Sequence, residues 1–184
     1  MNERSARYST VAVVLHWVIA LIMIYMLFFG EDLIRVRRGE PLVASSSSLH
    51  ATLGITILIL SVVRLAWRLA KPVPAEIAGL KSWERMLSKA VYAGFYVLMI
   101  GIPLTGWLAL TPYAARHNSP GVVRFFNTFD AGVLPDVGGW AGEAHGWGAN
   151  IGIALLALHV LGALKHQFMD KVNILGRMNP FGQP

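Results

Sequence analysis

The sequence predicts an all-α integral membrane protein, a four-helix transmembrane bundle. Of its 184 residues, 55% are hydrophobic and only 14% are charged. The mean hydropathy of +0.53 is too high for an ordinary water-soluble domain of this length. Four stretches lack Asp, Glu, Lys and Arg, and each reaches the roughly 20 residues that a helix needs to cross a hydrocarbon core. These stretches are residues 8–30, 41–63, 90–115 and 144–164.

The four stretches make up about half of the chain, and the segments between and around them are too short for a separate soluble domain. We therefore expect a single transmembrane domain over residues 1–184, because a bundle of helices satisfies the backbone within each span. The predicted spans are about 8–30, 44–68, 86–111 and 144–166.

The ends and connections of the spans carry further signals. The first span has a basic start like a signal peptide, but its apolar run is too long and no small-residue cleavage site follows, so we expect it to be retained. Four serines at 45–48 are typical of a helix start. Pro103 predicts a kink in the third span, and Trp83 is expected to anchor that span at the interface. The segment "GVVRFFNTF" in the outer loop is expected to form a short helix on the membrane surface.

The distribution of Lys and Arg predicts the orientation of the chain in the membrane. Four spans place both termini on one side, and eleven of the 16 basic residues lie on that side. By the positive-inside rule, both termini are expected in the cytoplasm. The net charge of +6 is spread over the ends of apolar spans without a dense run, so we do not expect nucleic-acid binding.

Cysteine is absent, which restricts the chemistry of any cofactor site. The chain has no disulfides, no thiolate metal ligands, no iron–sulfur ligation and no covalent attachment of a c-type haem. Any cofactor must therefore be held by histidine, methionine or carboxylate side chains.

Four histidines within the apolar spans are expected to form two pairs at two membrane depths. His145 and His159 are 14 residues apart, so they lie roughly 40° apart around a helix and about 21 Å apart along it. His16 lies near the cytoplasmic start of the first span, and His50 lies near the external start of the second. Depth matching pairs His16 with His159 and His50 with His145.

Paired imidazoles at two depths indicate two b-type haems, each with one axial nitrogen from each of two helices. Ionisable groups within spans are costly and usually face a functional site. A zinc or copper site would recruit three or four ligands at one depth, and no such cluster is present. A hydrogen-bonded structural role is the alternative for any single histidine.

Other residues are candidates for contacts with these cofactors. Gly54, four residues after His50, leaves room for a flat group between helices. Arg64 is expected to pair with a propionate of the inner haem, or else to snorkel to the membrane surface. His166 shares a face with His159, but Lys165 places it at the membrane boundary. We therefore expect His159 to be the ligand, with His166 a possible contact for a propionate or a quinone headgroup.

The combined pattern resembles the prokaryotic cytochrome b561 family. The resemblance rests on "RYSTVAVVLHW", "LHATLGITILILSVVRLAWRL" and "HGWGANIGIALLALHVLGALKHQF" followed by "RMNP", and it covers essentially the whole chain. It implies a protein of the bacterial inner membrane whose four spans hold two haem b groups. The family's ligand positions match His16, His50, His145 and His159, in agreement with the pairing by depth.

The resemblance further implies membrane electron transfer. The most similar type is a small stand-alone protein that oxidises superoxide on the periplasmic side and passes electrons to ubiquinone. Cationic residues of the outer face could attract a small anion, although acidic residues on the same face make its net charge about neutral. The candidates are Arg35, Arg37, Arg38, Arg116, Arg124 and His117.

Two alternative functions fit the same sequence. The chain could be the haem-b membrane anchor of a larger dehydrogenase or hydrogenase, with a partner redox protein as the electron donor. It could also be a histidine-lined transporter without haem. Haem content separates the last alternative from the other two, and the presence of an iron–sulfur partner separates the anchor from a stand-alone protein.

Overall fold

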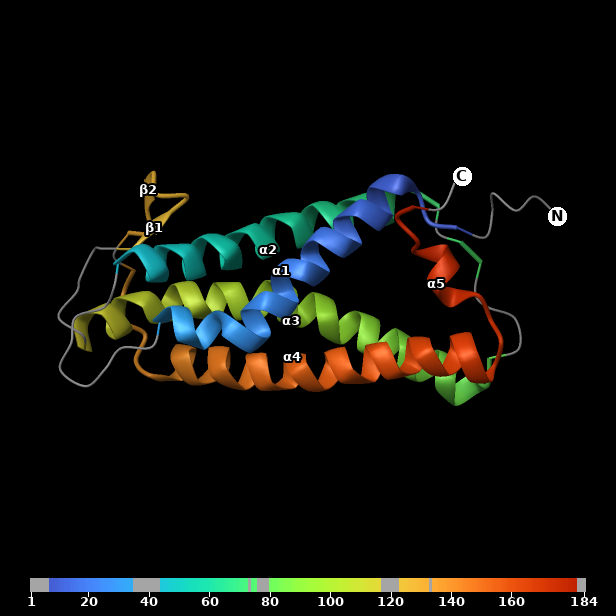
Figure 1. Cartoon of the computed structure of the whole chain (residues 1–184). Helices are drawn as coiled ribbons and strands as arrows, with labels where there is room; N and C mark the ends of the chain where they lie inside the picture. Colours follow the sequence, from blue (N-terminus) through green and yellow to red (C-terminus); the bar gives the residue numbers. More distant parts are fainter. Residues whose placement is uncertain are drawn as a thin grey trace.

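Four long antiparallel helices lie side by side in the computed structural model (Figure 1). The structure describes residues 7–34, 44–72, 74–75, 80–116, 123–132 and 134–181. The helices are α1 (Thr10–Ile34), α2 (Ala44–Ala70), α3 (Ser82–Arg116) and α4 (Trp140–Leu164). All four are long and apolar enough to cross a membrane. The prediction of an all-α transmembrane four-helix bundle is therefore confirmed.

The helices pack in a ring. α1 and α3 each contact both α2 and α4, so α2 and α4 are diagonal to one another. Large apolar side chains point outward along the whole length of the bundle, among them Leu21, Leu69 and Val97, which are 65%, 80% and 69% exposed. Such a surface is unstable in water and suits contact with lipid tails.

Each predicted span falls on one helix, with ends that differ by a few residues. The largest differences are in α3, which begins four residues earlier than expected and runs through Pro103 and Pro112. α4 begins at Trp140 and continues into the π-helix η2 (Lys165–Met169), and a short helix α5 (Ile174–Arg177) follows.

The expected surface helix in the outer loop is wrong for the residues that the structure describes there. Instead, β1 (Arg124–Phe125) and β2 (Phe129–Asp130) form an antiparallel hairpin. Residues 126–128 connect the strands, and Phe126 and Asn127 both have a φ of 54°, which is the left-handed conformation of the two central residues of a type I′ turn. The sequence lacks the Asn-Gly signal of such turns, so side-chain contacts to the bundle must fix this conformation.

The hairpin is attached to the outer ends of α2 and α3. The Ser48 hydroxyl accepts a hydrogen bond from the Arg124 backbone N–H at 3.0 Å, and the Thr52 hydroxyl accepts one from the Phe126 N–H at 2.8 Å. The Trp107 indole N–H donates to the carbonyl of Ala131 at 2.9 Å. These bonds place the hairpin over the end of the bundle that contains His50.

The C-terminal segment folds back across the opposite end of the bundle, where both termini lie (Figure 1). The Trp17 indole N–H donates to the carbonyl of Met178 at 2.7 Å, and the Tyr8 N–H donates to the carbonyl of Arg177 at 3.3 Å. The Arg177 guanidinium donates to the carbonyl of Ala75 at 2.6 Å. The segment therefore ties the start of α1 to the connection between α2 and α3.

The middle of the bundle is filled by an apolar cluster of Ile19, Ile57, Tyr96 and Met99. Close approach of α3 and α4 depends on a glycine of α4: a Cβ added at Gly148 would lie 2.8 Å from Cγ1 of Ile102. That separation is shorter than two carbon atoms tolerate, so the two helices pack at this depth because the side chain is absent.

We expect Gly148→Ala to destabilise the bundle by about 1–3 kcal/mol, the usual cost of overpacking. The matched control is Gly162→Ala on the same helix, where an added Cβ would meet no atom within 4 Å. Thermal unfolding in detergent should show a lower midpoint for Gly148→Ala alone. Equal midpoints for the two variants would show that this helix contact is not tight.

Candidate functional site: two histidine pairs

The histidine pair nearer the hairpin, which we name the outer pair after the predicted orientation of the chain, spans the diagonal between α2 and α4. The ring centroids of His50 and His145 lie 5.9 Å apart, and their planes are inclined by 54°. Each ring is also held by a hydrogen bond to a backbone carbonyl of a third helix. Nδ1 of His50 lies 2.9 Å from the carbonyl oxygen of Gly30, and Nδ1 of His145 lies 2.8 Å from that of Ile102.

These two hydrogen bonds determine which nitrogen of each ring is free. A carbonyl oxygen only accepts, so Nδ1 must carry the proton in both rings. In a neutral imidazole, Nε2 then has an unprotonated lone pair. This is the arrangement that protein histidines adopt as metal ligands, with one nitrogen on the metal and the other donating to a carbonyl.

Two glycines permit these contacts. A Cβ added at Gly106 would lie 2.8 Å from both Nδ1 and Cε1 of His145, so only glycine allows the ring to approach α3. A Cβ at Gly30 would lie 3.5 Å from Cε1 of His50, which is an ordinary contact. Gly106 therefore acts as a positioning residue for His145.

The inner histidine pair joins α1 and α4. The ring centroids of His16 and His159 lie 6.2 Å apart, with their planes inclined by 69°. Trp17 contacts the His16 ring edge-on with centroids 5.4 Å apart, and Phe95 contacts the His159 ring in the same manner at 5.5 Å. The structure thus brings together the same two pairs that were predicted from depth along the helices.

Arg64 of α2 lies at the inner pair, close enough to interact electrostatically with both rings. It also lines a groove between the start of α1 and the end of α2. The groove combines cations with aromatic and hydroxyl groups at the membrane boundary, which suits a carboxylate or another anion. Its lining residues are Tyr8, Ser9, Ala12, Arg64, Trp67, Arg68, Lys71 and Pro72.

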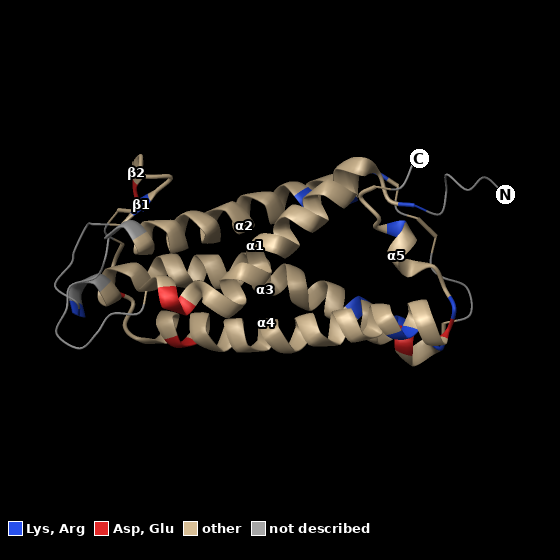
Figure 2. Ribbon diagram, viewed as in Figure 1, with Lys and Arg blue, Asp and Glu red and all other residues tan. Residues whose placement is uncertain are grey.

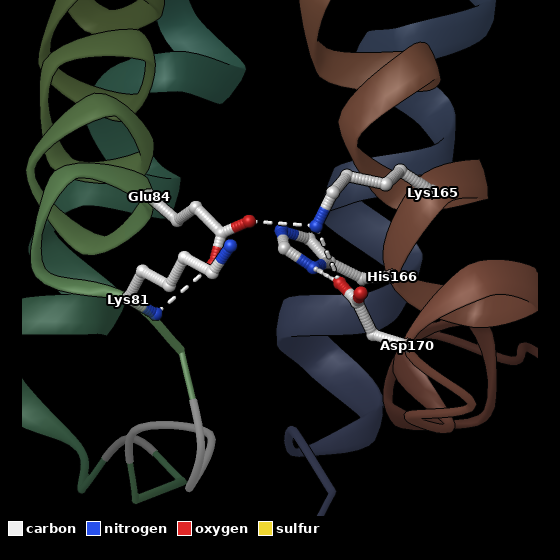
Figure 3. A network of polar contacts seen from close by, with 5 residues as sticks. All are labelled: Lys81, Glu84, Lys165, His166 and Asp170. Atoms are coloured by element: carbon white, nitrogen blue, oxygen red, sulfur yellow. Dashed lines mark hydrogen bonds and ion pairs between the residues drawn. The ribbon is translucent and has the colours of Figure 1, made fainter.

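His166 belongs to a separate polar network at the inner end (Figure 3). Its Nδ1 lies 2.6 Å from a carboxylate oxygen of Asp170. The Lys165 ammonium bridges Asp170 at 2.7 Å and Glu84 of α3 at 2.6 Å. Hydrogen bonds from Lys165 and then His166 hold the pKa of Asp170 below its usual range. The network closes the end of α4 against α3, because the Lys165 ammonium contacts a carboxylate on each side.

The candidate residues for anion attraction are only partly placed. Arg116 is exposed at the end of α3, and Arg124 is exposed on β1. The remaining candidates lie outside the residues that the structure describes, namely Arg35, Arg37, Arg38 and His117.

The separation of the rings in each histidine pair is compatible with a single iron between them. Two imidazoles that coordinate one metal from opposite sides at about 2 Å each have ring centres about 6 Å apart, which both pairs match. One turn after His50, a Cβ added at Gly54 would meet no atom within 4 Å, so no other group packs against α2 at that point. The donor set of two imidazoles suits a b-type haem.

Sequence reasoning missed the groups that orient the rings. The identities of Gly30 and Ile102 do not indicate that their carbonyls accept these hydrogen bonds, because every residue has a carbonyl. Gly106 lies in "GIPLTGW", whose two glycines are typical of close helix contact but do not indicate which group is contacted. The ring contact of Phe95 had no signal among the many apolar residues of the third span.

The site and fold together define a membrane-spanning helical bundle that holds four histidines in two facing pairs. A family model described as prokaryotic cytochrome b561 matches residues 7–180. The chain belongs to this family. It is therefore a multi-pass bacterial membrane protein that holds b-type haem and takes part in transmembrane electron transfer.

The similarity to known proteins extends over nearly the full length of the chain. Cytochrome b561 homolog 2 of Escherichia coli is 28% identical, and the match covers 94% of this chain and 90% of that protein. Cytochrome b562 of Cereibacter sphaeroides is 25% identical, over 93% and 94% of the two chains. A probable superoxide oxidase CybB of Yersinia pestis is 26% identical, over 95% and 96%.

We expect Gly106→Ala to lower the haem content of the purified protein, because the added methyl displaces His145 from its hydrogen bond to Ile102. Gly101→Ala on the same helix is the control, since a Cβ there would meet no atom within 4 Å. Haem per polypeptide, measured from the absorbance of the extracted haem, should fall only for Gly106→Ala. Full haem content in both variants would exclude the positioning role of Gly106.

Proposed function

We propose that the chain holds one b haem on each histidine pair and transfers electrons between the outer and inner ends of the bundle. The outer haem would be ligated by His50 and His145, and the inner haem by His16 and His159. The observation that carries this proposal is the separation of about 6 Å between the rings of both pairs. The haem iron, when bound, supplies the one-electron redox couple.

The protein orients the histidine rings and surrounds the two sites with apolar side chains. Backbone carbonyls fix the ring orientation of the outer pair, and aromatic edges pack against the inner pair. The apolar cluster in the middle of the bundle lies between the two pairs. Because the histidines of α4 are about 21 Å apart along the helix, the two sites together extend across most of a hydrocarbon core of about 30 Å.

His159, and not His166, is the proposed inner ligand. His159 faces His16, whereas Nδ1 of His166 is engaged by Asp170. Arg64 is the proposed partner of an inner haem propionate, since its guanidinium lies at the inner pair and matches a carboxylate with two parallel hydrogen bonds.

Both termini are proposed to lie in the cytoplasm, so that the inner pair is on the cytoplasmic side. Superoxide is the proposed donor on the periplasmic side, and ubiquinone is the proposed acceptor. The match to a probable superoxide oxidase supports the proposed donor. Exposed Arg116 and Arg124 add positive charge where a small anion would approach.

Ligation is tested by counting haem. We expect two haems per polypeptide in the wild-type protein, with a low-spin b-type reduced-minus-oxidised spectrum, and one haem in His145→Leu or His159→Leu. Asn150→Leu, a polar-to-apolar change on the same helix, is the control. A colourless folded protein would refute the scheme and favour a transporter, and two haems retained in both histidine variants would refute the proposed ligands.

The proposed electron donor is tested by removing positive charge from the outer face. If superoxide enters from the outer face, Arg116→Gln with Arg124→Gln should slow reduction by about twofold or more and weaken its dependence on ionic strength. Arg85→Gln, at the opposite end of the bundle, should leave the rate unchanged. Rates that do not differ among these variants would argue against electrostatic capture, and purification with an iron–sulfur partner would favour the anchor function.

A further inference from the structure

We infer that the chain gives the outer haem site the lower reduction potential and the inner site the higher one. Electrons would then move downhill from the outer to the inner end without help from the membrane potential. This inference rests on the proposed function, because it requires a haem on each histidine pair. It concerns the residues around the rings, which differ sharply between the two sites.

The outer site is built to favour the oxidised iron. Both of its imidazoles donate Nδ1–H to a backbone carbonyl, at 2.9 Å for His50 and 2.8 Å for His145. Such a hydrogen bond increases electron density on the ring and makes Nε2 a more basic ligand. A more basic pair of axial ligands stabilises the higher oxidation state, and the reduction potential falls.

The inner site is built to favour the reduced iron. In the described part of the chain, neither His16 nor His159 has a hydrogen bond from its ring to a backbone carbonyl. The two rings instead contact the aromatic rings of Trp17 and Phe95. The Arg64 guanidinium lies near both rings, and a positive charge nearby stabilises an added electron.

Arg64 would offset the negative charge of the inner haem propionate with which it is proposed to pair, and this favours the reduced iron. Within the residues that the structure describes, no carboxylate forms an ion pair with Arg64, and its side chain is only partly exposed. Salt and water therefore screen it less than a surface charge. Arg68, one turn further along α2, stacks on the ring of Tyr92 with its guanidinium carbon 4.1 Å from the centroid, and adds positive charge at the same end.

Surface charge does not distinguish the two ends. Figure 2 shows acidic residues on α1 and α4 near the end that carries the hairpin, together with basic residues on α3 and β1, and both signs of charge at the other end. The difference between the sites therefore rests on the hydrogen bonds of the outer pair and the guanidinium at the inner pair, which both place the outer potential below the inner one.

A redox titration of the full-length holoprotein in lipid nanodiscs tests the inference. The wild-type protein should show two midpoint potentials. Arg64→Gln should lower the higher one and leave the lower one in place, while Arg64→Lys should restore most of the loss because it retains the charge. Arg85→Gln removes a charge from the same end at the exposed start of α3, and should change neither potential.

The outcomes separate the inference from the proposed function. Fewer than two haems in the wild-type protein would refute the function itself. Two haems with a shift of the lower potential in Arg64→Gln, or with no shift at all, would leave the function standing and overturn the inference.

A second pair of variants covers the case in which Arg64→Gln loses the inner haem. His50→Leu and His145→Leu remove an outer ligand and retain the inner pair. The haem that remains should titrate at the higher of the two wild-type potentials. A remaining haem at the lower potential would overturn the inference.

Discussion

The hydrogen bonds from the outer histidines to the carbonyls of Gly30 and Ile102 are the constraint on which the site depends. Leaving the N–H group of a neutral imidazole without a partner in an apolar bundle costs free energy, because the surroundings offer no water. Donating it to a backbone carbonyl of a neighbouring helix fixes the ring, selects the protonated nitrogen and leaves the lone pair of Nε2 free. The helices α1 and α3 are thereby part of the outer site although they supply no ligand to it.

This constraint also explains the close packing of the bundle at the outer end. His145 reaches Ile102 only because Gly106 has no side chain, and α4 approaches α3 at that depth only because Gly148 has none. The same requirement for space therefore determines both the packing of α3 on α4 and the position of the ring. The hairpin over this end adds hydrogen bonds to α2 through Ser48 and Thr52, on either side of His50.

The inner end is organised by different means. Its rings contact aromatic edges, a guanidinium lies beside them, and the C-terminal segment is tied to Trp17, the neighbour of His16. The network of Lys165, Glu84, His166 and Asp170 completes this end by joining α4 to α3. The two ends thus offer a bound redox group two electrostatically distinct environments, which an electron carrier can use to direct flow.

The sequence by itself determined the class of fold and the composition of the site. Apolar stretches without charges give four spans because the bilayer sets their length, and the helical repeat places His145 and His159 on one face of α4. The tertiary structure alone decided what holds the rings, since a backbone carbonyl is present at every residue and becomes specific only when helices pack. The same reason explains the error at residues 123–132: "GVVRFFNTF" has no strong local turn signal, and its hairpin is fixed by bonds to Ser48, Thr52 and Trp107, which are distant in sequence.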